Sequence, residues 1–282
     1  MGRISRTVQL AKASWRVLMA DKELMLLPVI SAAATLIAIA TFVYPLVLSN
    51  PETFTEDAST GTWLVLVALY VLLAFITIFF NAALVSAANE RLTGGDPTVK
   101  SALRGAARHV GAIFGWALVS ATVSMILRAL EERFEGLGRL FVGLLGAAWS
   151  LITFLVIPVL VIEGASVGDA MKRSGSMLKK TWGEQIAANI GFGLLGFVAA
   201  IPGFAIGAAG ISAGGAAAAI GLTIAIVWVA LVAVVTSTLS GIFQTALYHY
   251  AASGSVPGDY FSRDQMSQAF RPRRRRGGTW AG

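Results

Sequence analysis

Six long apolar stretches dominate this sequence of 282 residues. Each is close to the roughly 20 residues that a helix needs to cross the hydrocarbon core of a bilayer. Only 13% of the residues are charged, whereas soluble domains usually carry about 25%, so most of the folded surface must face lipid. We therefore predict an all-α polytopic membrane protein whose six transmembrane helices pair as three hairpins. The predicted spans are about 24–48, 63–88, 110–128, 140–162, 185–210 and 220–245.

Positive charge falls on alternate connections between these stretches. Of the 22 Lys and Arg residues, 19 lie in the N-terminal segment, the second and fourth connections and the C-terminal tail, which leaves only Arg128, Arg133 and Arg139 on the other side. Lys and Arg are enriched in the cytoplasmic loops of membrane proteins. We therefore expect a multi-pass protein of the cell inner (plasma) membrane, with both termini in the cytoplasm.

A basic amphipathic helix is predicted before the first, third and fifth spans, at residues 1–23, 97–109 and 166–182. The order of basic helix, span, outer loop and span thus occurs three times, which favours a repeated building unit without proving a duplication. A basic tail, 251–282, follows the sixth span, which we expect to continue as one helix to about residue 250.

The first of these helices carries Val8, Ala11, Trp15 and Leu18 at helical spacing. This apolar stripe predicts a helix that lies on the membrane surface.

Two further helix starts have recognisable signals. Asp96 followed by Pro97 predicts an N-cap and a first helical residue, and the helix is expected to run on into the third span. Ser166 and Asp169 resemble a capping box with Asp in place of Glu.

The basic helices and the tail are candidates for contacts with anionic lipid. Lys100, Arg104 and Arg108 recur every four residues and form one stripe, and each cation near an anionic leaflet contributes about 1 kcal/mol. The simpler interpretation, that they only satisfy the charge rule for insertion, remains open. Nucleic acid is not an expected partner, and a membrane-protein partner is left open. The candidate lipid contacts are Lys100, Arg104, Arg108, Lys172, Arg173, Lys179, Lys180, Arg273, Arg274, Arg275 and Arg276.

Polar groups inside the spans are few. No ionisable residue lies at mid-depth, where proton-coupled transporters and intramembrane enzymes need one. Glu90, Glu163 and Glu184 lie near the cytoplasmic ends of spans, where pairing at the interface explains them. The deeper polar side chains have two interpretations, as interhelical hydrogen bonds or as a polar cavity. They are Asn81, Asn189 and Gln244.

The sequence contains no arrangement of residues typical of a catalytic, metal or cofactor site. Cysteine is absent, and the two histidines, His109 and His249, have no partner at ligand spacing. The segment Gly191–Gly196 matches a dinucleotide fingerprint but follows no strand, so close helix packing through small residues explains it better. The same packing is predicted at Gly203-x-x-x-Gly207 and at Gly111-x-x-x-Gly115.

The two ends of the chain carry a family resemblance. Residues 3–18 with Asp21–Leu24, and the ending Leu247–Ala251 with Ala269–Pro272, resemble a bacterial family of uncharacterised six-span membrane proteins. That family is distantly similar to the membrane domain attached to some glycerophosphodiester phosphodiesterases. The resemblance implies six helices with amphipathic connections and supplies no catalytic residues.

The leading functional hypothesis is a non-enzymatic envelope module that makes lipid or protein contacts at its cytoplasmic face. The basic helices motivate it, together with the lack of reactive groups in the spans. The alternative is a transporter or channel for a small uncharged or lipidic solute. That alternative rests on the Gly-rich fifth span, expected to bend at Pro202, and on Asn81, Asn189 and Gln244.

Overall fold

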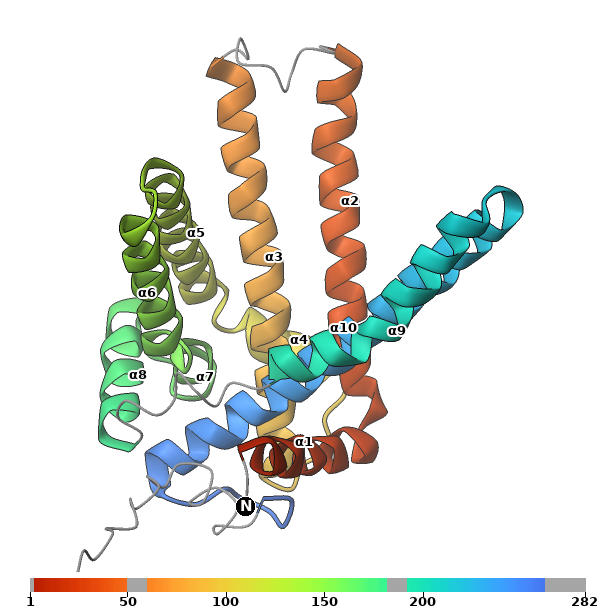
Figure 1. Cartoon of the computed structure of the whole chain (residues 1–282). Helices are drawn as coiled ribbons and strands as arrows, with labels where there is room; N and C mark the ends of the chain where they lie inside the picture. Colours follow the sequence, from red (N-terminus) through yellow and green to blue (C-terminus); the bar gives the residue numbers. More distant parts are fainter. Residues whose placement is uncertain (1–2, 50–59, 182–191, 262–282) are drawn as a thin grey trace, which may run out of the picture.

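The computed structural model describes residues 3–49, 60–181 and 192–261, and its regular elements there are all helical (Figure 1). Short connections separate most of these helices. The elements are α1 (Arg3–Ala20), the 3₁₀ turn η1 (Lys22–Met25), α2 (Leu26–Ser49), α3 (Thr60–Leu92), α4 (Val99–Ala107), α5 (Val110–Arg133), α6 (Leu137–Ile152), α7 (Val156–Ile162), α8 (Val167–Thr181), α9 (Phe192–Ala213) and α10 (Gly215–Ser253).

Six helical segments are long and apolar enough to cross a membrane, which confirms the predicted fold class of a multi-pass membrane protein. The sixth span is one helix, α10, as predicted. The helix before the third span does not continue into that span as expected, because α4 ends at Ala107 and α5 begins at Val110. The six segments are Lys22–Tyr44, Thr60–Leu92, Val110–Arg133, Leu137–Ile162, Leu195–Ala213 and Gly215–Ser253.

Consecutive spans pack as three hairpins, α2 with α3, α5 with α6 and α9 with α10. Figure 1 shows the three hairpin tips on one side of the molecule, while α1, α4, α8 and the last turns of α10 lie on the other. We call this second side the basic end. At 1.5 Å per residue α10 is about 58 Å long, well over the roughly 30 Å of the hydrocarbon core, and the α9–α10 hairpin leans away from α2 and α3 (Figure 1).

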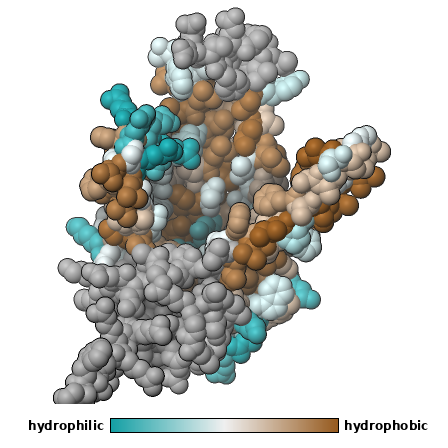
Figure 2. All heavy atoms as spheres, in the orientation of Figure 1, coloured by the Kyte–Doolittle hydropathy of each residue, from teal (hydrophilic) through white to brown (hydrophobic). Residues whose placement is uncertain are grey.

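The packed core lies at the basic end rather than at the centre of the spans. Most residues from Ala82 to Leu92 on α3 and from Thr238 to Tyr248 on α10 are buried, together with one face of α1 and most of α7. Few residues in the most apolar stretches of α3 and α10 are buried, and apolar surface follows the α9–α10 hairpin in Figure 2. Lipid therefore solvates the outer halves of these helices, while protein contacts fix their basic ends.

The fourth predicted span is broken at residues 153–155, between α6 and α7. Pro158 explains the break, because it has no N–H to offer the carbonyl of Phe154 four residues earlier. Gln244 of α10 donates its side-chain amide to that carbonyl instead. Ser174 of α8 accepts from the N–H of Leu155 at 3.1 Å and donates to the carbonyl of Ile152 at 2.6 Å. Neighbouring helices thus satisfy the backbone groups that the break sets free.

Small residues bring α9 against α10. A side chain at Gly203 would meet Trp228, and one at Gly210 would lie 2.8 Å from the Cα of Gly221. This confirms close packing at Gly203 and Gly207. The prediction fails for Gly111, which faces open space, but holds for Gly115, where a Cβ would lie 3.3 Å from the side chain of Val167 on α8. Of the segment Gly191–Gly196, Gly196 packs against Thr236, Gly193 faces open space, and Gly191 lies outside the described residues. α9 continues as a helix through Pro202.

The first helix buries one member of its predicted apolar stripe, Leu18, and leaves another, Trp15, exposed. Leu10, Ala13, Ser14 and Val17 are buried against the core, whereas Trp15 is 44% exposed. α1 packs along α10 at the basic end. The helix therefore has two apolar faces, because Trp15 and Met19 remain available to lipid while the residues on the other face hold α1 to the protein.

A polar pocket between α3 and α4

A pocket of about 410 Å³ opens at the basic end between α3 and α4. Each wall follows one helical face, with contributing residues at positions i, i+3, i+4 and i+7. Because these faces carry hydroxyl, amide and charged groups, the pocket is polar on both sides. Ser86, Asn89, Glu90 and Thr93 line it from α3 and the residue after it, and Ser101, Arg104, Gly105 and Arg108 from α4 and its C-cap.

Gly105 allows α3 and α4 to approach closely, and a capping box fixes the start of α4. A Cβ at Gly105 would overlap the side chain of Ser86, so a larger residue would push α4 away from α3. The N-cap of α4 is Thr98 rather than the predicted Asp96. Thr98 and Ser101 exchange hydrogen bonds of 3.1 Å and 3.0 Å between side chain and backbone. Asp96 lies two residues too early to reach those N–H groups, and its carboxylate lies 3.5 Å from Arg91 instead.

Glu90 is held on the pocket wall. Its carboxylate accepts a 2.8 Å hydrogen bond from the hydroxyl of Ser101, and its backbone carbonyl accepts the N–H of Gly95 at 2.8 Å. A Cβ at Gly95 would lie 2.8 Å from the Cγ of Glu90, so the loop closes tightly over this side chain. No ion pair joins Glu90 to either pocket arginine in the described part of the chain.

Asn89 is oriented from behind by α10. Its side-chain oxygen lies 2.7 Å from Nε2 of His249. Since an amide oxygen only accepts, the histidine donates, and the Nδ2 amino group of Asn89 is free to donate to a ligand. His249 therefore orients this amide.

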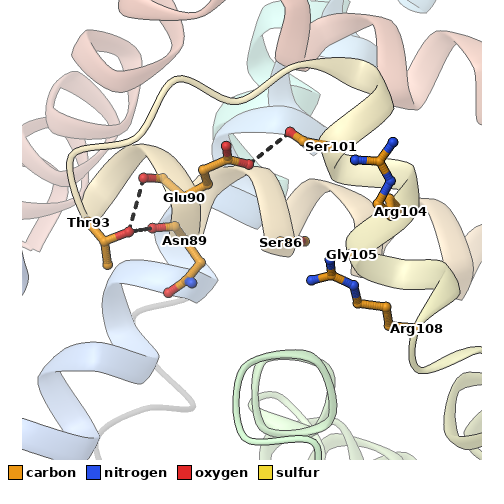
Figure 3. A pocket seen from close by; sticks show the side chains of 8 residues that line it. All are labelled: Ser86, Asn89, Glu90, Thr93, Ser101, Arg104, Gly105 and Arg108. Carbon is orange, nitrogen blue, oxygen red and sulfur yellow. Dashed lines mark hydrogen bonds between the residues drawn. The ribbon is translucent and has the colours of Figure 1, made fainter.

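The guanidinium groups of Arg104 and Arg108 form no ion pair and no hydrogen bond with any residue that the structure describes. Figure 3 shows both on the α4 side of the pocket, with the Glu90–Ser101 hydrogen bond along another edge. The hydroxyl of Ser86 also lacks a described partner. The pocket thus presents unpaired donors, a combination suited to phosphate or another oxyanion.

Some other charged groups at the basic end are paired with one another. Arg91 lies 2.7 Å from Asp21, which joins the end of α3 to the junction between α1 and α2. Burial raises the pKa of the Asp21 carboxyl, and the positive charge of Arg91 partly opposes that shift.

A second cluster links α7, α8 and α10. Arg173 lies 2.5 Å from Glu163, which also accepts a 2.8 Å hydrogen bond from the hydroxyl of Tyr248. The hydrogen bond that Arg173 donates to Glu163 and the negative charge of Glu163 raise the pKa of the Arg173 guanidinium.

The structure separates the predicted lipid contacts into different groups. Arg104 and Arg108 share the pocket, Arg173 is paired, and Lys100 and Lys172 lie outside the pocket. All five residues are exposed. The side chains of the remaining candidates lie outside the described residues. They are Lys179, Lys180, Arg273, Arg274, Arg275 and Arg276.

The deeper polar side chains, for which a polar cavity was one of two interpretations, have different surroundings. The amide of Gln244 bonds to the backbone of Phe154, which matches the interpretation as an interhelical hydrogen bond. The side-chain oxygen of Asn81 is buried without a hydrogen-bond partner among the described residues. Asn189 lies outside those residues.

The pocket residues of α3 and Ser101 were missed as a group from sequence. Their signal was the i, i+3, i+4, i+7 spacing of polar residues at the end of an apolar helix, which places them on one face. Across residues 3–49, 60–181 and 192–261, no three His, Asp or Glu side chains lie close enough together to hold a metal ion.

The sequence profile of DUF6159, a family of unknown function, matches residues 60–258. The chain belongs to this family. The DUF6159 match spans α3 to α10 and so includes both walls of the pocket. No curated protein and no solved structure matches the chain.

Proposed function

We propose that this protein is a non-enzymatic membrane module that binds phosphate-bearing lipid headgroups at its cytoplasmic face, in the pocket between α3 and α4. One observation carries the proposal: Arg104 and Arg108 line a pocket of about 410 Å³ without any ion-pair partner among the described residues. An arginine that serves only the fold would be expected to meet a carboxylate or a backbone carbonyl, as Arg91 and Arg173 do.

The position of the pocket favours a lipid over a soluble anion. Arg108 caps the end of α4, and two residues later α5 begins a span whose side chains Val110 and Phe114 are exposed. Phe114 packs edge-on against Phe75 of α3. A headgroup in the pocket would therefore have apolar surface beside it for its acyl chains.

The proposed orientation places the basic end in the cytoplasm. The support is the distribution of Lys and Arg, 19 of 22 on that side, because these residues set the orientation of membrane helices. The plasma membrane is the proposed location, since the cytoplasmic leaflet of a cell membrane supplies the anionic lipids that basic segments attract. A membrane-protein partner at the same face is compatible with this proposal.

The test is lipid retention by the full-length protein, purified in detergent with mixed lipids and measured by native mass spectrometry. Arg104→Gln with Arg108→Gln should reduce retained phosphatidylglycerol about thirtyfold, since two cations near an anionic lipid contribute about 2 kcal/mol. Lys100→Gln with Lys172→Gln removes the same charge at the same end but outside the pocket. Arg128→Gln with Arg139→Gln removes it at the opposite end.

Both control pairs should leave retention within a few-fold of the unsubstituted protein. Equal losses of lipid retention in the pocket pair and the Lys100/Lys172 pair would indicate a diffuse basic surface and not a defined site. Unchanged retention in the pocket pair would refute the proposal.

A transporter or channel for a small uncharged or lipidic solute is the alternative. Its support has weakened, because Gln244 serves the helix break, although the buried oxygen of Asn81 has no described partner. The distant similarity to the membrane domain of glycerophosphodiester phosphodiesterases also remains a proposal. Solute flux into liposomes that is abolished by Asn81→Leu would favour the alternative.

A further inference from the structure

Glu90 gives the pocket a second chemical character. A carboxylate in a site made only for anions would repel its ligand, yet this one lies in the pocket wall beside two arginines. Only one of its two oxygens has a described protein donor, the hydroxyl of Ser101. The other oxygen lacks a described partner and remains able to accept from a ligand.

The surroundings of Glu90 hold its carboxylate apart from the arginines. Ser101 belongs to the capping box of α4 and fixes the carboxylate from one side. Gly95 packs over the aliphatic part of the side chain. The pocket therefore presents negative and positive groups at separate places, with one net positive charge from two guanidinium groups and one carboxylate.

This distribution matches a ligand that carries a singly negative phosphodiester together with a positively charged hydrogen-bond donor. From it we infer that the pocket recognises a phosphoethanolamine headgroup, with the phosphate at Arg104 and Arg108 and the primary ammonium at Glu90. Asn89, fixed by His249, donates its amide to the phosphate. The inference rests on the proposed function, because it names the lipid that the same pocket would hold.

Competing headgroups fit less well. Phosphatidylglycerol offers the same phosphate with hydroxyl donors only, and a neutral donor makes a weaker hydrogen bond to a carboxylate than an ammonium does. A choline headgroup carries the positive charge but has no N–H to donate. The three headgroups therefore separate the contributions of phosphate, charge and hydrogen bonding.

Retention from an equimolar mixture of phosphatidylethanolamine, phosphatidylglycerol and phosphatidylcholine tests the inference. The full-length protein should retain phosphatidylethanolamine preferentially. Glu90→Gln should lower the ratio of phosphatidylethanolamine to phosphatidylglycerol roughly tenfold, the size expected for losing one charge-assisted hydrogen bond. The glutamine oxygen can still accept from Ser101, so the fold is preserved, and an unchanged melting temperature checks this. Glu132→Gln, at the opposite end, is the matched control and should leave the ratio unchanged.

Two outcomes overturn the inference without touching the proposed function. One is an unchanged ratio in Glu90→Gln, and the other is equal retention of phosphatidylcholine and phosphatidylethanolamine, while Arg104→Gln with Arg108→Gln still loses lipid. If that arginine pair loses nothing, the proposed function fails as well.

A further arm uses glycerophosphoethanolamine, which keeps the phosphodiester and the ammonium of the headgroup but has no acyl chains. It should raise the melting temperature of delipidated protein only at concentrations far above those at which the lipid acts. Equal potency would make the ligand a soluble metabolite and overturn the assignment to a lipid.

Discussion

Gln244 of α10 donates its side-chain amide to the carbonyl of Phe154, in the break between α6 and α7. This contact couples the last span to the fourth across 90 residues of sequence. The carbonyl is free because Pro158 has no N–H to offer it. A polar residue deep in an apolar helix is thus explained by a backbone irregularity in a neighbouring helix, and this role needs no ligand.

Gln244→Leu should destabilise the protein by about 1–3 kcal/mol, the cost of leaving a buried polar group without its partner. The expected readout is a lower melting temperature in detergent. Asn81→Leu is the control on a facing helix, because the side-chain oxygen of Asn81 already lacks a described partner. It should leave stability unchanged or raise it. Equal losses in the two variants would contradict the assigned role of Gln244.

The contact between Gly210 and Gly221 sets the close approach of α9 and α10. A Cβ at Gly210 would lie 2.8 Å from the Cα of Gly221 and 2.9 Å from the carbonyl of Ala217, and backbone atoms cannot move aside as a side chain can. Gly210→Val should therefore push the two helices apart. Gly143→Val, in open space on α6, is the control.

The separation can be measured by spin labels on two introduced cysteines, one on each helix, since the chain has no cysteine of its own. The distance between labels should increase for Gly210→Val and stay constant for Gly143→Val. An unchanged distance in both variants would show that the glycine contact does not determine the helix separation.

The burial of the Asp21 carboxyl, which is paired with Arg91, should make stability depend on pH. Burial raises the pKa of Asp21 above its ordinary value of 3.8, so between the unfolded and folded pKa values the folded protein binds more protons. Stability then falls as the pH rises through that window and becomes level above it. Asp21→Asn removes this contribution.

The difference in unfolding free energy between the unsubstituted protein and Asp21→Asn should therefore shrink as the pH rises from 3.8. Arg91→Gln should extend the window upward, because Arg91 is the group that opposes the shift. Asp259→Asn is a control, as an acidic residue outside this cluster. A difference that grows with pH would show that the pair lowers the pKa of Asp21.

The spans and their pairing could be predicted from sequence because long apolar runs and Lys/Arg placement depend on the membrane alone. The break at residues 153–155 could not, since it depends on donors from Ser174 and Gln244 that are distant in sequence. The N-cap at Thr98 was missed because Asp96 before Pro97 carries a strong local signal, and only the capping-box geometry with Ser101 decides between them.

The arginines of the candidate pocket were predicted from their helical spacing, but the pocket itself was not. The charge pattern placed Arg104, Arg108 and Arg173 in one group. In the structure Arg173 pairs with Glu163, whereas Arg104 and Arg108 have no ion-pair partner among the described residues. Whether a cation is available depends on which carboxylate folds beside it. That information comes from the packing of α7 and α8, and no local pattern contains it.

The cluster of Glu163, Arg173 and Tyr248 offers a test of which contact stabilises the basic end. The side chain of Arg173 is 53% exposed, and an exposed ion pair contributes at most about 1 kcal/mol. Tyr248 is 6% exposed and donates to the same carboxylate at 2.8 Å, a hydrogen bond to a charged group that contributes about 1.5–3 kcal/mol. Tyr248→Phe should therefore lower the melting temperature more than Arg173→Gln does.

Tyr70→Phe, on α3, is the matched control for losing a hydroxyl. If Arg173→Gln proves the more damaging, the ion pair rather than the tyrosine joins α7 to its neighbours.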